Sequence, residues 1–525
     1  MVIGLDYALA LVSGALLALS FPRYGHPAFA WIALVPLLVA LTGYHGPVPR
    51  GVGERGAGGV AGRGRLPSTP PLRAFLLGLT TGFVYFAGTL YWTGSVIRTF
   101  GGIPLPAAVL GVCLLALYQG FFPALFALIS SRLIARGGLA GILLSAAAWV
   151  ATEFFRGVVF GGFPWVLLGD SQVTVLPVAQ LASVLGVYGV TALVAFINAS
   201  IAYALLASRR GRAAAIATAA AVLIATGAWG ASRIADGGLT RAGTPIRVAL
   251  IQANIAQEEK WKSGEARRIV TTYVALTRDA VKRGAEFVIW PESATPFMFE
   301  QDAAGQEALR SLARELRVPM LFGSDQEVVR PEPALYNAAF LVAPDGQTAA
   351  VYRKIHLVPW GEFVPLKRLL FFVSPLVDSF TDFSPGTEMV MLPVGSHLTN
   401  TAICYEVVYP SLMRRAVLAG SELLTTITND AWYGHSSAPY QHFALASMRA
   451  IEQGRYLARA ANTGISGVVD PYGRIVRQSG IFEQDALIEE VRFLTVRTIY
   501  SRIGDAIAYV AIAMVALGLI VLRRN

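Results

Sequence analysis

Charged residues are scarce in this chain. Only 14% of its 525 residues are Asp, Glu, Lys or Arg, whereas 54% are hydrophobic, and that balance excludes an ordinary soluble protein of this length. Uncharged apolar runs of roughly 18 residues or more recur along the sequence, and one such run is long enough to cross the hydrocarbon core of a bilayer as a helix. The composition therefore predicts an integral membrane protein.

Cysteine is almost absent too. One of the two cysteines, Cys113, lies in an apolar run, and the other, Cys404, lies in a polar region far from it. We therefore expect no structural disulfide, and the sequence contains neither a Cys-x-x-Cys pair nor a Cys/His spacing typical of zinc sites. The interpretation is a free thiol at Cys404, with no metal and no cofactor.

Acidic residues are outnumbered by basic ones, which gives a formal net charge of +10. The arginines concentrate in short loops between apolar runs, where Lys and Arg mark the cytoplasmic side of a membrane protein, so we expect no nucleic-acid binding. These loops alternate with loops that hold little beyond Arg23 and Arg98. The alternation predicts that both termini are cytoplasmic and that residues 231–502 lie on the periplasmic face of a bacterial inner membrane. The basic loops and tail carry Arg50, Arg55, Arg63, Arg65, Arg132, Arg136, Arg209, Arg210, Arg212, Arg523 and Arg524.

Eight apolar segments predict eight transmembrane helices. Seven of them form a domain of residues 1–230, and the eighth forms residues 503–525 together with a short cytoplasmic tail. Glu153 and Arg156 lie three residues apart in the fifth segment, where they form a structural ion pair across one helical turn or serve a function inside the membrane. The segments are 4–21, 27–43, 73–96, 103–131, 138–156, 178–207, 213–230 and 503–522.

From Thr244 onward the pattern changes to alternating strands and helices, which predicts an α/β domain within residues 231–502. A domain of roughly 250 residues has an ample hydrophobic core. The expected strands are 246–252, 286–290, 319–324, 336–344, 348–354, 398–405 and 422–430, with a closing hairpin around 471–473, and the expected helices are 263–283, 303–317, 410–419 and 438–458.

Three reactive side chains occupy comparable positions in this domain. Glu292 follows the strand at 286–290, Lys354 ends the strand at 348–354, and Cys404 lies at the end of the strand at 398–405. Side chains at strand ends are held rigidly and still reach a cleft. Alone, Glu292 is explained as a loop cap, Lys354 as a surface cation and Cys404 as an inert core thiol. Together they favour a catalytic site.

The chemistry gives each of these groups a role. A thiol has a pKa of about 8.5 and needs activation at neutral pH. Glu292 would take the thiol proton and later a proton from an incoming amine, while Lys354 and backbone N–H groups would stabilise a tetrahedral oxyanion. The three groups would thus make and break an acyl-cysteine bond at Cys404.

Longer motifs surround these residues. The three segments are similar to those of the nitrilase superfamily, and the chain as a whole, with its eight apolar segments, resembles the apolipoprotein N-acyltransferases. After FPW the family's pattern has an aromatic residue where this chain has Asp170, which leaves the contact of that loop open. The motifs are FPW at 163–165, QANI at 252–255 followed by Trp261, WPES at 290–293, RKIHLVPWGEFVP at 353–365, CYE at 404–406, NDAWY at 429–433 and QHFALASMRAIEQGR at 441–455.

The resemblance implies an αββα sandwich and a catalytic triad of Glu292, Lys354 and Cys404. It also implies a two-step reaction, in which a phospholipid gives its acyl chain to Cys404 as a thioester. The acyl chain then passes to the α-amine of the N-terminal S-diacylglyceryl-cysteine of an apolipoprotein. Glu362 matches the position of a second active-site glutamate of the family. Trp261, Tyr405 and Glu406 match positions that support activity or substrate binding. For Glu406, a structural role is an open alternative.

An apolar loop predicts contact with lipid. Residues 357–385 are unusually apolar for an extracytoplasmic loop, which indicates a membrane-facing lid or a buried hairpin. Lys367 and Arg368 beside it would meet lipid phosphates. The candidate lid residues are Trp360, Phe363, Leu369, Phe371 and Phe372.

The residues after the strand at 422–430 are also expected near the site. Asn429, Trp432 and Tyr433 would line the cleft, although ordinary packing explains them equally well. We interpret His442 as structural, because Glu292 already supplies a base.

Two other functions stay open at the level of the sequence. A membrane-anchored amidase that hydrolyses a small C–N substrate would use the same triad, but it needs one anchor rather than eight segments. A transporter or scaffold would carry an inactive domain, which the intact triad and the few charges inside the apolar segments disfavour. We therefore expect a monomeric acyltransferase in the bilayer, with a phospholipid as donor and a diacylglyceryl-modified apolipoprotein as acceptor.

Overall fold

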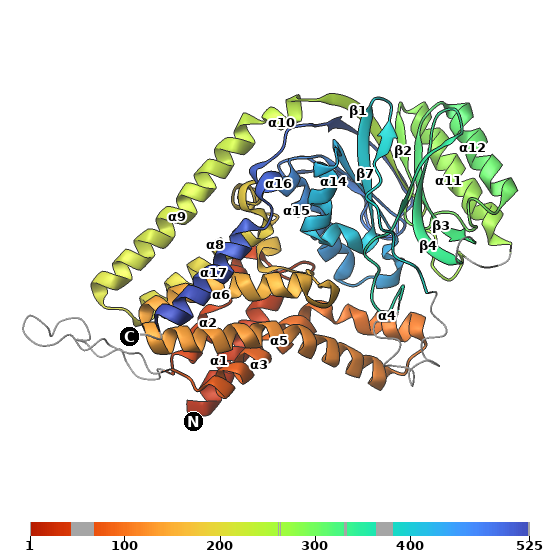
Figure 1. Cartoon of the computed structure of the whole chain (residues 1–525). Helices are drawn as coiled ribbons and strands as arrows, with labels where there is room; N and C mark the ends of the chain where they lie inside the picture. Colours follow the sequence, from red (N-terminus) through yellow and green to blue (C-terminus); the bar gives the residue numbers. More distant parts are fainter. Residues whose placement is uncertain are drawn as a thin grey trace, which may run out of the picture. The chain divides into compact units, whose positions relative to one another are not determined.

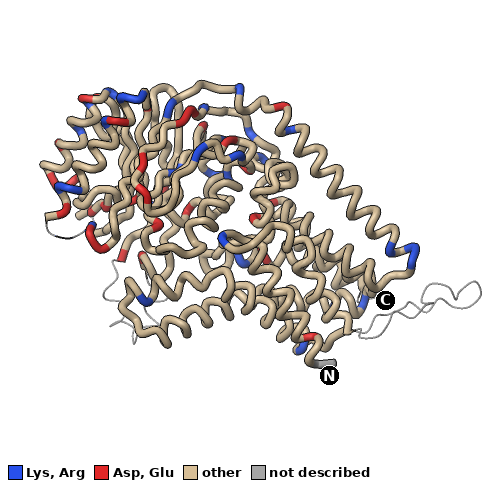
Figure 2. The backbone as a smooth tube through the Cα atoms, turned by 180° about the vertical axis from the view of Figure 1, so that it is seen from behind, with Lys and Arg blue, Asp and Glu red and all other residues tan. Residues whose placement is uncertain are grey.

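The chain forms two compact units. The computed structural model describes residues 2–43, 68–260, 262, 264–329, 333–363 and 382–522. One unit, here called the helical unit, consists of Met1–Asp236 and Ile503–Asn525, and the other, the α/β unit, consists of Gly237–Arg502. Figure 2 shows that Lys, Arg, Asp and Glu crowd the α/β unit and are sparse along the helices of the other.

The helical unit consists of apolar helices (Figure 1). In chain order they are α1 (Val2–Ala18), α2 (Val35–Leu41), α3 (Pro71–Leu90), α4 (Trp92–Gly101), α5 (Leu105–Gly137), α6 (Leu139–Val158), α7 (Leu176–Ala179), α8 (Ala182–Leu206), α9 (Arg209–Asp236) and α17 (Ala506–Val521).

Five helical stretches among the described residues are long and apolar enough to cross a membrane. Three further apolar helices are shorter than that limit. The structure therefore supports a membrane protein with five candidate spans, while the number of eight stays a prediction. The five spans are Pro71–Leu90, Leu105–Gly137, Leu139–Gly161, Ala182–Leu206 and Arg209–Arg241, and the shorter helices are Gly4–Ala18, Pro27–Leu41 and Ala506–Val521.

Small residues let α3 and α5 pack closely. Gly78 and Gly82 lie one turn apart in α3, and a side chain on either would collide with α5. A Cβ on Gly78 would lie 2.4 Å from the carbonyl oxygen of Pro123, and one on Gly82 would lie 2.5 Å from the Cα of Gly120. Glycines at this spacing let membrane helices approach backbone to backbone, so they set the distance between these two candidate spans.

A buried ion pair organises the segment that follows α6. The Nη2 atom of Arg156 and the Oε1 atom of Glu153 are 3.8 Å apart. Arg156 donates to the carbonyl oxygens of Phe163 at 2.9 Å and Trp165 at 2.8 Å, and Glu153 accepts from the Leu168 N–H at 2.7 Å. Because both charges hold the backbone of this segment, the geometry favours the structural interpretation of the pair.

Asp170, where the chain departs from the family pattern, has a local role. Its Oδ2 atom accepts a hydrogen bond from the Leu167 N–H at 3.1 Å, at the start of the 3-10 helix Leu168–Gln172. A carboxylate that accepts from the first free N–H groups of a helix stabilises that helix end.

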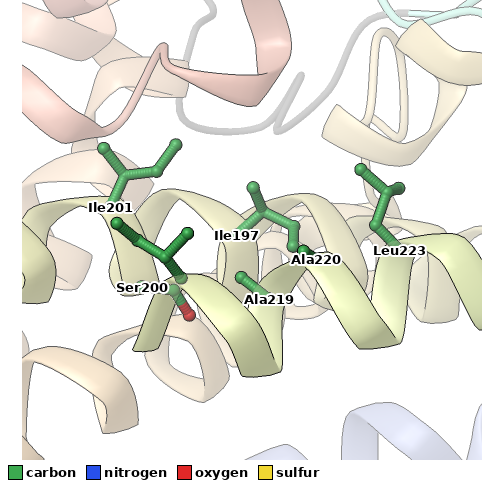
Figure 3. Close-up of a pocket in the computed structure, with 7 residues that line it drawn as sticks. Ile197, Ser200, Ile201, Ala219, Ala220 and Leu223 are labelled. Carbon is green, nitrogen blue, oxygen red and sulfur yellow. The ribbon is translucent and has the colours of Figure 1, made fainter. Parts of the chain in front are cut away.

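An apolar groove lies between α8 and α9 (Figure 3). Its volume is about 200 Å³. Two of the four α9 residues that line the groove are alanines, whose small side chains leave space between the two helices. Because no charged side chain lines the groove, it suits a helix surface that faces lipid. The lining residues are Ile197, Ser200 and Ile201 of α8, and Ile216, Ala219, Ala220 and Leu223 of α9.

The α/β unit contains two six-stranded sheets, with the strand orders β12-β1-β2-β3-β4-β5 and β11-β10-β9-β8-β7-β6. Strands β1, β2 and β3 are parallel, and so are β7, β8 and β9. The first sheet contains β1 (Thr244–Gln252), β2 (Phe287–Ile289), β3 (Met320–Val328), β4 (Ala334–Val342), β5 (Thr348–Arg353) and β12 (Asp485–Phe493), and the second contains β6 (Leu392–Val394), β7 (His397–Ile403), β8 (Leu423–Thr428), β9 (Leu457–Ala461), β10 (Gly467–Val469) and β11 (Ile475–Gln478).

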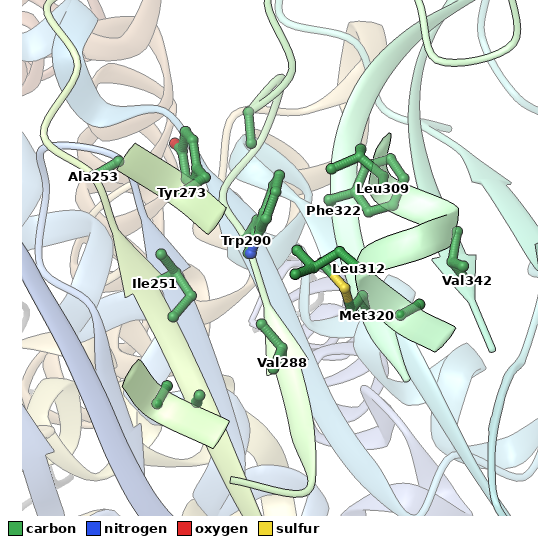
Figure 4. Packing of buried hydrophobic residues seen from close by; sticks show 14 of the residues in the cluster. Ile251, Ala253, Tyr273, Val288, Trp290, Leu309, Leu312, Met320, Phe322 and Val342 are labelled. Atoms are coloured by element: carbon green, nitrogen blue, oxygen red, sulfur yellow. The ribbon is translucent and has the colours of Figure 1, made fainter. Parts of the chain in front are cut away.

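Helices cover the two sheets on their outer faces (Figure 1). Helices α11 and α12 pack on the first sheet, where Trp290 lies among Tyr273, Val288 and Phe322 (Figure 4). The inner faces of the two sheets share one apolar core, in which Leu250 of β1 lies in the same cluster as residues of β7, β8 and β9. This layering is an αββα sandwich. The helices are α10 (Gly238–Arg241), α11 (Glu265–Lys282), α12 (Ala303–Leu316), α14 (Pro410–Leu418), α15 (Ala438–Gln453) and α16 (Ile499–Ile503).

Several predicted element ends differ from the structure; for example, the strand expected at 319–324 extends to Val328. The helix expected at 438–458 ends at Gln453, because Gly454 adopts a left-handed conformation with φ of 61° and the chain then enters β9. The strand expected at 398–405 ends at Ile403, because Cys404 begins a 3-10 helix. The sequence patterns also do not predict β6, β9 or β12.

Candidate active site

Adjacent strand ends bring polar residues to one edge of the second sheet. Cys404 directly follows β7, Asn429 follows β8 and Asn462 follows β9, in the order in which these strands pair. The Nδ2 atom of Asn462 donates to Oδ1 of Asn429 at 3.1 Å. Because the carboxyl ends of parallel strands meet at one edge, these side chains lie together although they are far apart in the sequence.

Glu292 reaches the same region from the first sheet. It lies three residues after β2, and its Oε2 atom accepts from the backbone N–H of Asn429 at 2.9 Å. The turn that carries it packs tightly against β3, where a Cβ on Gly323 would lie 2.7 Å from the Cα of Glu292. Glycine at that position permits the approach. The carboxylate therefore connects the strand ends of the two sheets.

Lys354 lies between two carboxylates. Its Nζ atom is 2.8 Å from Oε1 of Glu362 and 3.2 Å from Oε1 of Glu292. The Nδ2 atom of Asn337, in β4, donates to the same two oxygens at 2.8 Å each, and the Val358 N–H donates to the other Glu362 oxygen at 2.8 Å. Lys354 is 1% exposed and Glu292 is 7% exposed, so these groups form a buried, hydrogen-bonded array.

The charges in this array stabilise one another. Burial lowers the pKa of Lys354, but the negative charges of Glu362 and Glu292 outweigh it and raise that pKa above its usual value. Burial raises the pKa of Glu292, whereas the charge of Lys354 and the hydrogen bonds from Asn337 and Asn429 lower it, and the lowering prevails. At neutral pH the array therefore holds an ionised carboxylate beside a fixed ammonium group.

Cys404 is a buried thiol next to this array. Burial raises its pKa, and so does the charge of Glu292, while the charge of Lys354 and a hydrogen bond with Thr428 oppose the shift. The Tyr433 hydroxyl is also hydrogen-bonded to the thiol. The sulfur is thus protonated at neutral pH, and a base has to remove its proton for the sulfur to act as a nucleophile.

Glu406 is fully buried and accepts four hydrogen bonds. The donors are the backbone N–H groups of Ile355 at 2.6 Å, His356 at 3.1 Å and Ile403 at 2.8 Å, and the hydroxyl of Tyr352 at 2.8 Å. Burial raises the pKa of Glu406 to about 7, although these hydrogen bonds lower it. One carboxylate thereby ties the end of β5 to the end of β7 beside the thiol, which supports the structural alternative for this residue.

A second buried array adjoins Cys404. Its thiol, the Asp430 carboxylate and the His442 imidazole offer ligand atoms that all lie within 4.8 Å of one another, a donor set that zinc accepts. However, Nη2 of Arg459 is 2.9 Å from Oδ2 of Asp430 and 3.0 Å from Nδ1 of His442. A guanidinium group already pairs with both side chains, so the arrangement fits a hydrogen-bonded array better than a metal site.

The other predicted site residues differ in exposure. Tyr405 is buried, whereas Trp432 is 38% exposed and Trp360 is 51% exposed. Phe363 forms an isolated bridge with Pro359. The remaining predicted site residues, Trp261, Leu369, Phe371 and Phe372, lie outside the described residues.

Two polar residues near Glu292, Asn337 and Lys260, escape the sequence analysis. Asn337 bridges the two glutamates, and a lone Asn inside the apolar strand β4 is the signal that marks it. Lys260 is 6% exposed. Burial lowers its pKa to about 8, although the negative charges of Asp325 and Glu292 raise that pKa. Lys260 stands in the polar run QEEKWK, which is typical of a solvated surface, so no local signal reveals its burial.

Two family models match the chain. The carbon-nitrogen hydrolase model matches residues 247–500, and the model of the apolipoprotein N-acyltransferase N-terminal domain matches residues 13–200. An amidase from Nesterenkonia sp. is similar in structure, with 22% identity, a TM-score of 0.37 and coverage of 48% of this chain and 93% of that one. Nit3 of Saccharomyces cerevisiae, of the nitrilase superfamily, has 19% identity, a TM-score of 0.38 and coverage of 47% and 90%.

Relatives of known name match nearly the whole chain. An apolipoprotein N-acyltransferase of Geobacter metallireducens is 38% identical over 522 residues, which cover 97% of this chain and 93% of that protein. One of Gloeobacter violaceus is 34% identical over 524 residues, with the same two coverages. One of Shewanella oneidensis is 32% identical over 517 residues, with 95% and 92% covered. The resemblance predicted from the motifs is therefore confirmed, and the chain belongs to the apolipoprotein N-acyltransferase family.

Proposed function

We propose that this chain transfers an acyl chain from a phospholipid, through a thioester on Cys404, to the α-amine of the S-diacylglyceryl-cysteine of apolipoproteins. The observation that carries the proposal is the buried array in which Lys354 Nζ lies 2.8 Å from Glu362 and 3.2 Å from Glu292, next to a buried thiol. It supplies a base, a fixed cation and a nucleophile in one place, as acyl transfer through cysteine requires. The names of the relatives supply the substrate class.

The first step forms the thioester. Glu292 takes the proton of the Cys404 thiol while the sulfur attacks the ester carbonyl of the phospholipid, and the negative charge that develops on the carbonyl oxygen is stabilised by the Lys354 ammonium. When the tetrahedral intermediate collapses, the C–O bond breaks and Glu292 returns the proton to the leaving oxygen. Lysophospholipid departs, and the acyl chain stays on the sulfur.

The second step transfers the acyl chain to nitrogen. The neutral α-amine of the diacylglyceryl-cysteine attacks the thioester carbonyl, and Glu292 removes one proton from that nitrogen. Collapse breaks the C–S bond, and the proton held by Glu292 returns to the sulfur. Glu362 keeps Lys354 charged and oriented in both steps, because it is the nearer of the two carboxylates bound to the ammonium.

The setting of the reaction is part of the proposal. The candidate spans in the helical unit support a membrane location, and both proposed substrates carry lipid chains. We propose that the membrane is the bacterial inner membrane, that both termini are cytoplasmic and that the active site faces the periplasm. The proposal keeps the domain limits inferred from the sequence, 1–230, 231–502 and 503–525, and a monomeric enzyme. The alternation of arginine-rich and arginine-poor loops in the sequence supports this orientation in the membrane.

Residues around the array are proposed to bind the substrates. Asn429 holds Glu292 through its backbone N–H, and Tyr433 is hydrogen-bonded to the thiol. Trp432, Tyr405 and Trp261 are proposed to line the path of the acyl chain. Further proposed contacts come from the lid residues Trp360, Phe363, Leu369, Phe371 and Phe372.

Mass spectrometry of the purified full chain after incubation with phospholipid tests the proposal. We expect an acyl adduct on the peptide that contains Cys404, and its loss when a diacylglyceryl-modified lipopeptide with a free α-amine is added. The lipopeptide should gain the same acyl mass. Cys404→Ser should show no adduct that hydroxylamine releases, because an ester with Ser resists hydroxylamine under conditions that cleave a thioester.

The matched control is Cys113→Ser, which changes the only other cysteine of the chain and should leave the adduct intact. An adduct on another residue would contradict the role of Cys404. Release of free fatty acid with no gain of mass by the lipopeptide would instead indicate that water takes up the acyl chain and that the protein is a hydrolase.

A further inference from the structure

The backbone of Cys404 has an unusual conformation. Its φ is 53°, in the left-handed region that residues other than glycine rarely adopt and that costs of order 1–3 kcal/mol unless neighbouring contacts impose it. The conformation turns the chain sharply from β7 into a 3-10 helix and presents the sulfur at the strand end. Contacts on both sides of the residue therefore have to hold it in place.

Glu406 provides the contact on the N-terminal side. Its Oε2 atom accepts from the Ile403 N–H at 2.8 Å. On the C-terminal side, Nε2 of His442 lies 3.1 Å from the carbonyl oxygen of Cys404. A carbonyl oxygen only accepts hydrogen bonds, so the Nε2 atom of His442 carries a proton and donates it to Cys404.

The other ring nitrogen is held by Arg459 and Asp430. Nη2 of Arg459 carries two hydrogens and lies 3.0 Å from Nδ1 of His442 and 2.9 Å from Oδ2 of Asp430, so it can donate one hydrogen to each. Burial lowers the pKa of His442, and so does the charge of Arg459, while Asp430 opposes the shift. His442 is therefore neutral, with Nδ1 as acceptor and Nε2 as donor.

We propose that His442 is a positioning residue: held by Arg459 and Asp430, it fixes the carbonyl of Cys404 and thereby the left-handed turn that aims the nucleophile. All three side chains are fully buried, so water cannot replace the lost donor. Removing it would leave the Cys404 carbonyl without this partner and free the turn to relax, which moves the sulfur relative to Glu292 and Lys354.

The same geometry argues against His442 as the base. Its Nε2 proton is engaged by the Cys404 carbonyl, and its Nδ1 lone pair faces the guanidinium of Arg459. Among the described residues, the charged or titratable groups that face the ring are the Cys404 thiol after β7, Asp430 from the segment after β8, Arg459 from β9 and, at 6.3 Å between ring centroids, Tyr433. Protonation of Nδ1 would direct it to Asp430 and leave the Nε2–H bond to Cys404 unchanged.

The test compares His442→Gln with His442→Asn in a Cys113→Ser background, so that Cys404 is the only thiol. The Gln amide nitrogen reaches about as far as Nε2 and keeps the donor, whereas the Asn amide is one carbon shorter and loses it. We expect the rate of Cys404 acylation by phospholipid to fall about tenfold or more in the Asn variant. The Gln variant should stay within about threefold of the parent, and the pH at half-maximal rate should be the same in all three.

This inference rests on the proposed function, so alkylation of Cys404 by iodoacetamide provides a second readout that needs no lipid. We expect the Asn variant to differ from the parent in alkylation rate and the Gln variant to match it. If the parent is alkylated but never acylated, the proposed function fails, and the alkylation rates still decide the role of His442.

Two results would overturn the positioning role. One is an equal loss of rate in the Gln and Asn variants that both fold, as judged by their thermal unfolding. The other is a shift of about one pH unit or more in the profile of the Gln variant, since that would assign His442 a proton-transfer role. Should the Asn variant fail to fold, Arg459→Lys replaces it. Lysine keeps the positive charge but lacks the planar guanidinium group that donates hydrogen bonds to both Asp430 and His442. The same fall of about tenfold is then expected, and an unchanged rate contradicts the proposal.

Discussion

At the scale of single residues, the site depends on one cation shared by two carboxylates. If Lys354 is replaced by Met, Glu292 and Glu362 face each other in a buried space without a positive charge. Breaking a buried ion pair costs about 3–5 kcal/mol, so we expect the free energy of unfolding of the full chain in detergent to drop by about 3 kcal/mol. The rate of Cys404 acylation should fall by about a thousandfold or more, because the oxyanion loses its counter-charge.

Lys282→Met is the matched control for this change. Lys282 is an exposed residue in the last turn of α11, so its loss should alter stability by less than about 0.5 kcal/mol. If Lys354→Met unfolds at the same temperature as this control and still acquires an acyl chain at a similar rate, the array has no role in either folding or catalysis.

Asp430 makes stability depend on pH. Burial raises its pKa, but the charge of Arg459 and hydrogen bonds, one of them from the Thr428 hydroxyl, outweigh burial and lower the pKa from 3.8 to about 2. A lowered carboxyl pKa adds stability that is present above pH 3.8 and is lost as the pH falls through 2. The difference of 3.8 minus about 2, at 1.36 kcal/mol per pH unit, corresponds to about 2 kcal/mol.

We therefore expect the melting temperature of the parent protein to fall more between pH 5 and pH 2.5 than that of Asp430→Asn. Differential scanning calorimetry in detergent measures it. Asp345→Asn, which makes the same chemical change at an exposed turn, should behave like the parent. Equal slopes for the parent and Asp430→Asn would show that Asp430 titrates alike in the folded and unfolded chains.

The sequence predicts Glu292, Lys354 and Cys404 at strand ends, and in the structure they directly or closely follow β2, β5 and β7. These strands belong to two different sheets, and the joint role of the three residues as a triad stays a prediction. The partners that orient them were not predictable. Arg459 and Asn337 reside inside strands, and only the pairing of those strands decides that the first meets Asp430 and the second meets both glutamates.

At the scale of elements, glycines allow α3 and α5 of the helical unit to pack closely. Gly82→Ala would place a Cβ 2.5 Å from the Cα of Gly120, so the helices have to separate. We expect a loss of about 1–3 kcal/mol, as for overpacked cores, measured as a lower melting temperature of the full chain in detergent.

Gly227→Ala in α9 is the control, because a Cβ there meets nothing within 4 Å among the described residues. The same added methyl group should leave the melting temperature unchanged or slightly raised, since alanine favours a helix over glycine. Equal losses for Gly82→Ala and Gly227→Ala would mean that helix propensity, not close packing, determines the effect.

Elements with a strong period were predictable, and their ends were less so. The amphipathic pattern of α11 and the apolar runs of β1 and β2 appear where the sequence indicates them. The apolar residues after 453 continue the pattern of α15, so only the left-handed Gly454 separates that helix from β9. A glycine inside an apolar run has several explanations, and the sequence alone does not choose among them.

At the scale of the whole molecule, the orientation proposed from the arginines can be tested by labelling. In a background without Cys113 and Cys404, Arg477→Cys introduces a thiol on the exposed strand β11, and Arg210→Cys introduces one at the exposed start of α9. We expect a membrane-impermeant maleimide to label the first in intact spheroplasts and the second only after the membrane is opened. The reverse pattern would place the active site in the cytosol.

Composition alone identified a membrane protein, because the hydropathy of a segment indicates whether it favours lipid or water, and this requires no knowledge of tertiary contacts. The count of spans was harder. Three predicted segments correspond to helices that are shorter than a membrane-spanning helix, for example Ala506–Val521. A run of apolar residues in the sequence does not reveal where the helix begins or ends. The boundary between the apolar helical segments and the α/β domain was nevertheless predictable from the change of sequence pattern at Thr244.

The first and last strands of the α/β unit are partners: β1 pairs along its whole length with β12, from Thr244 with Phe493 to Gln252 with Asp485. A ribosome that has finished β1 therefore has most of the unit still to translate before the partner emerges. At roughly 5–20 residues per second that wait is on the order of tens of seconds. During this time the edge of β1 is without its partner strand, so incomplete chains are exposed to pairing with other polypeptides until synthesis is nearly complete.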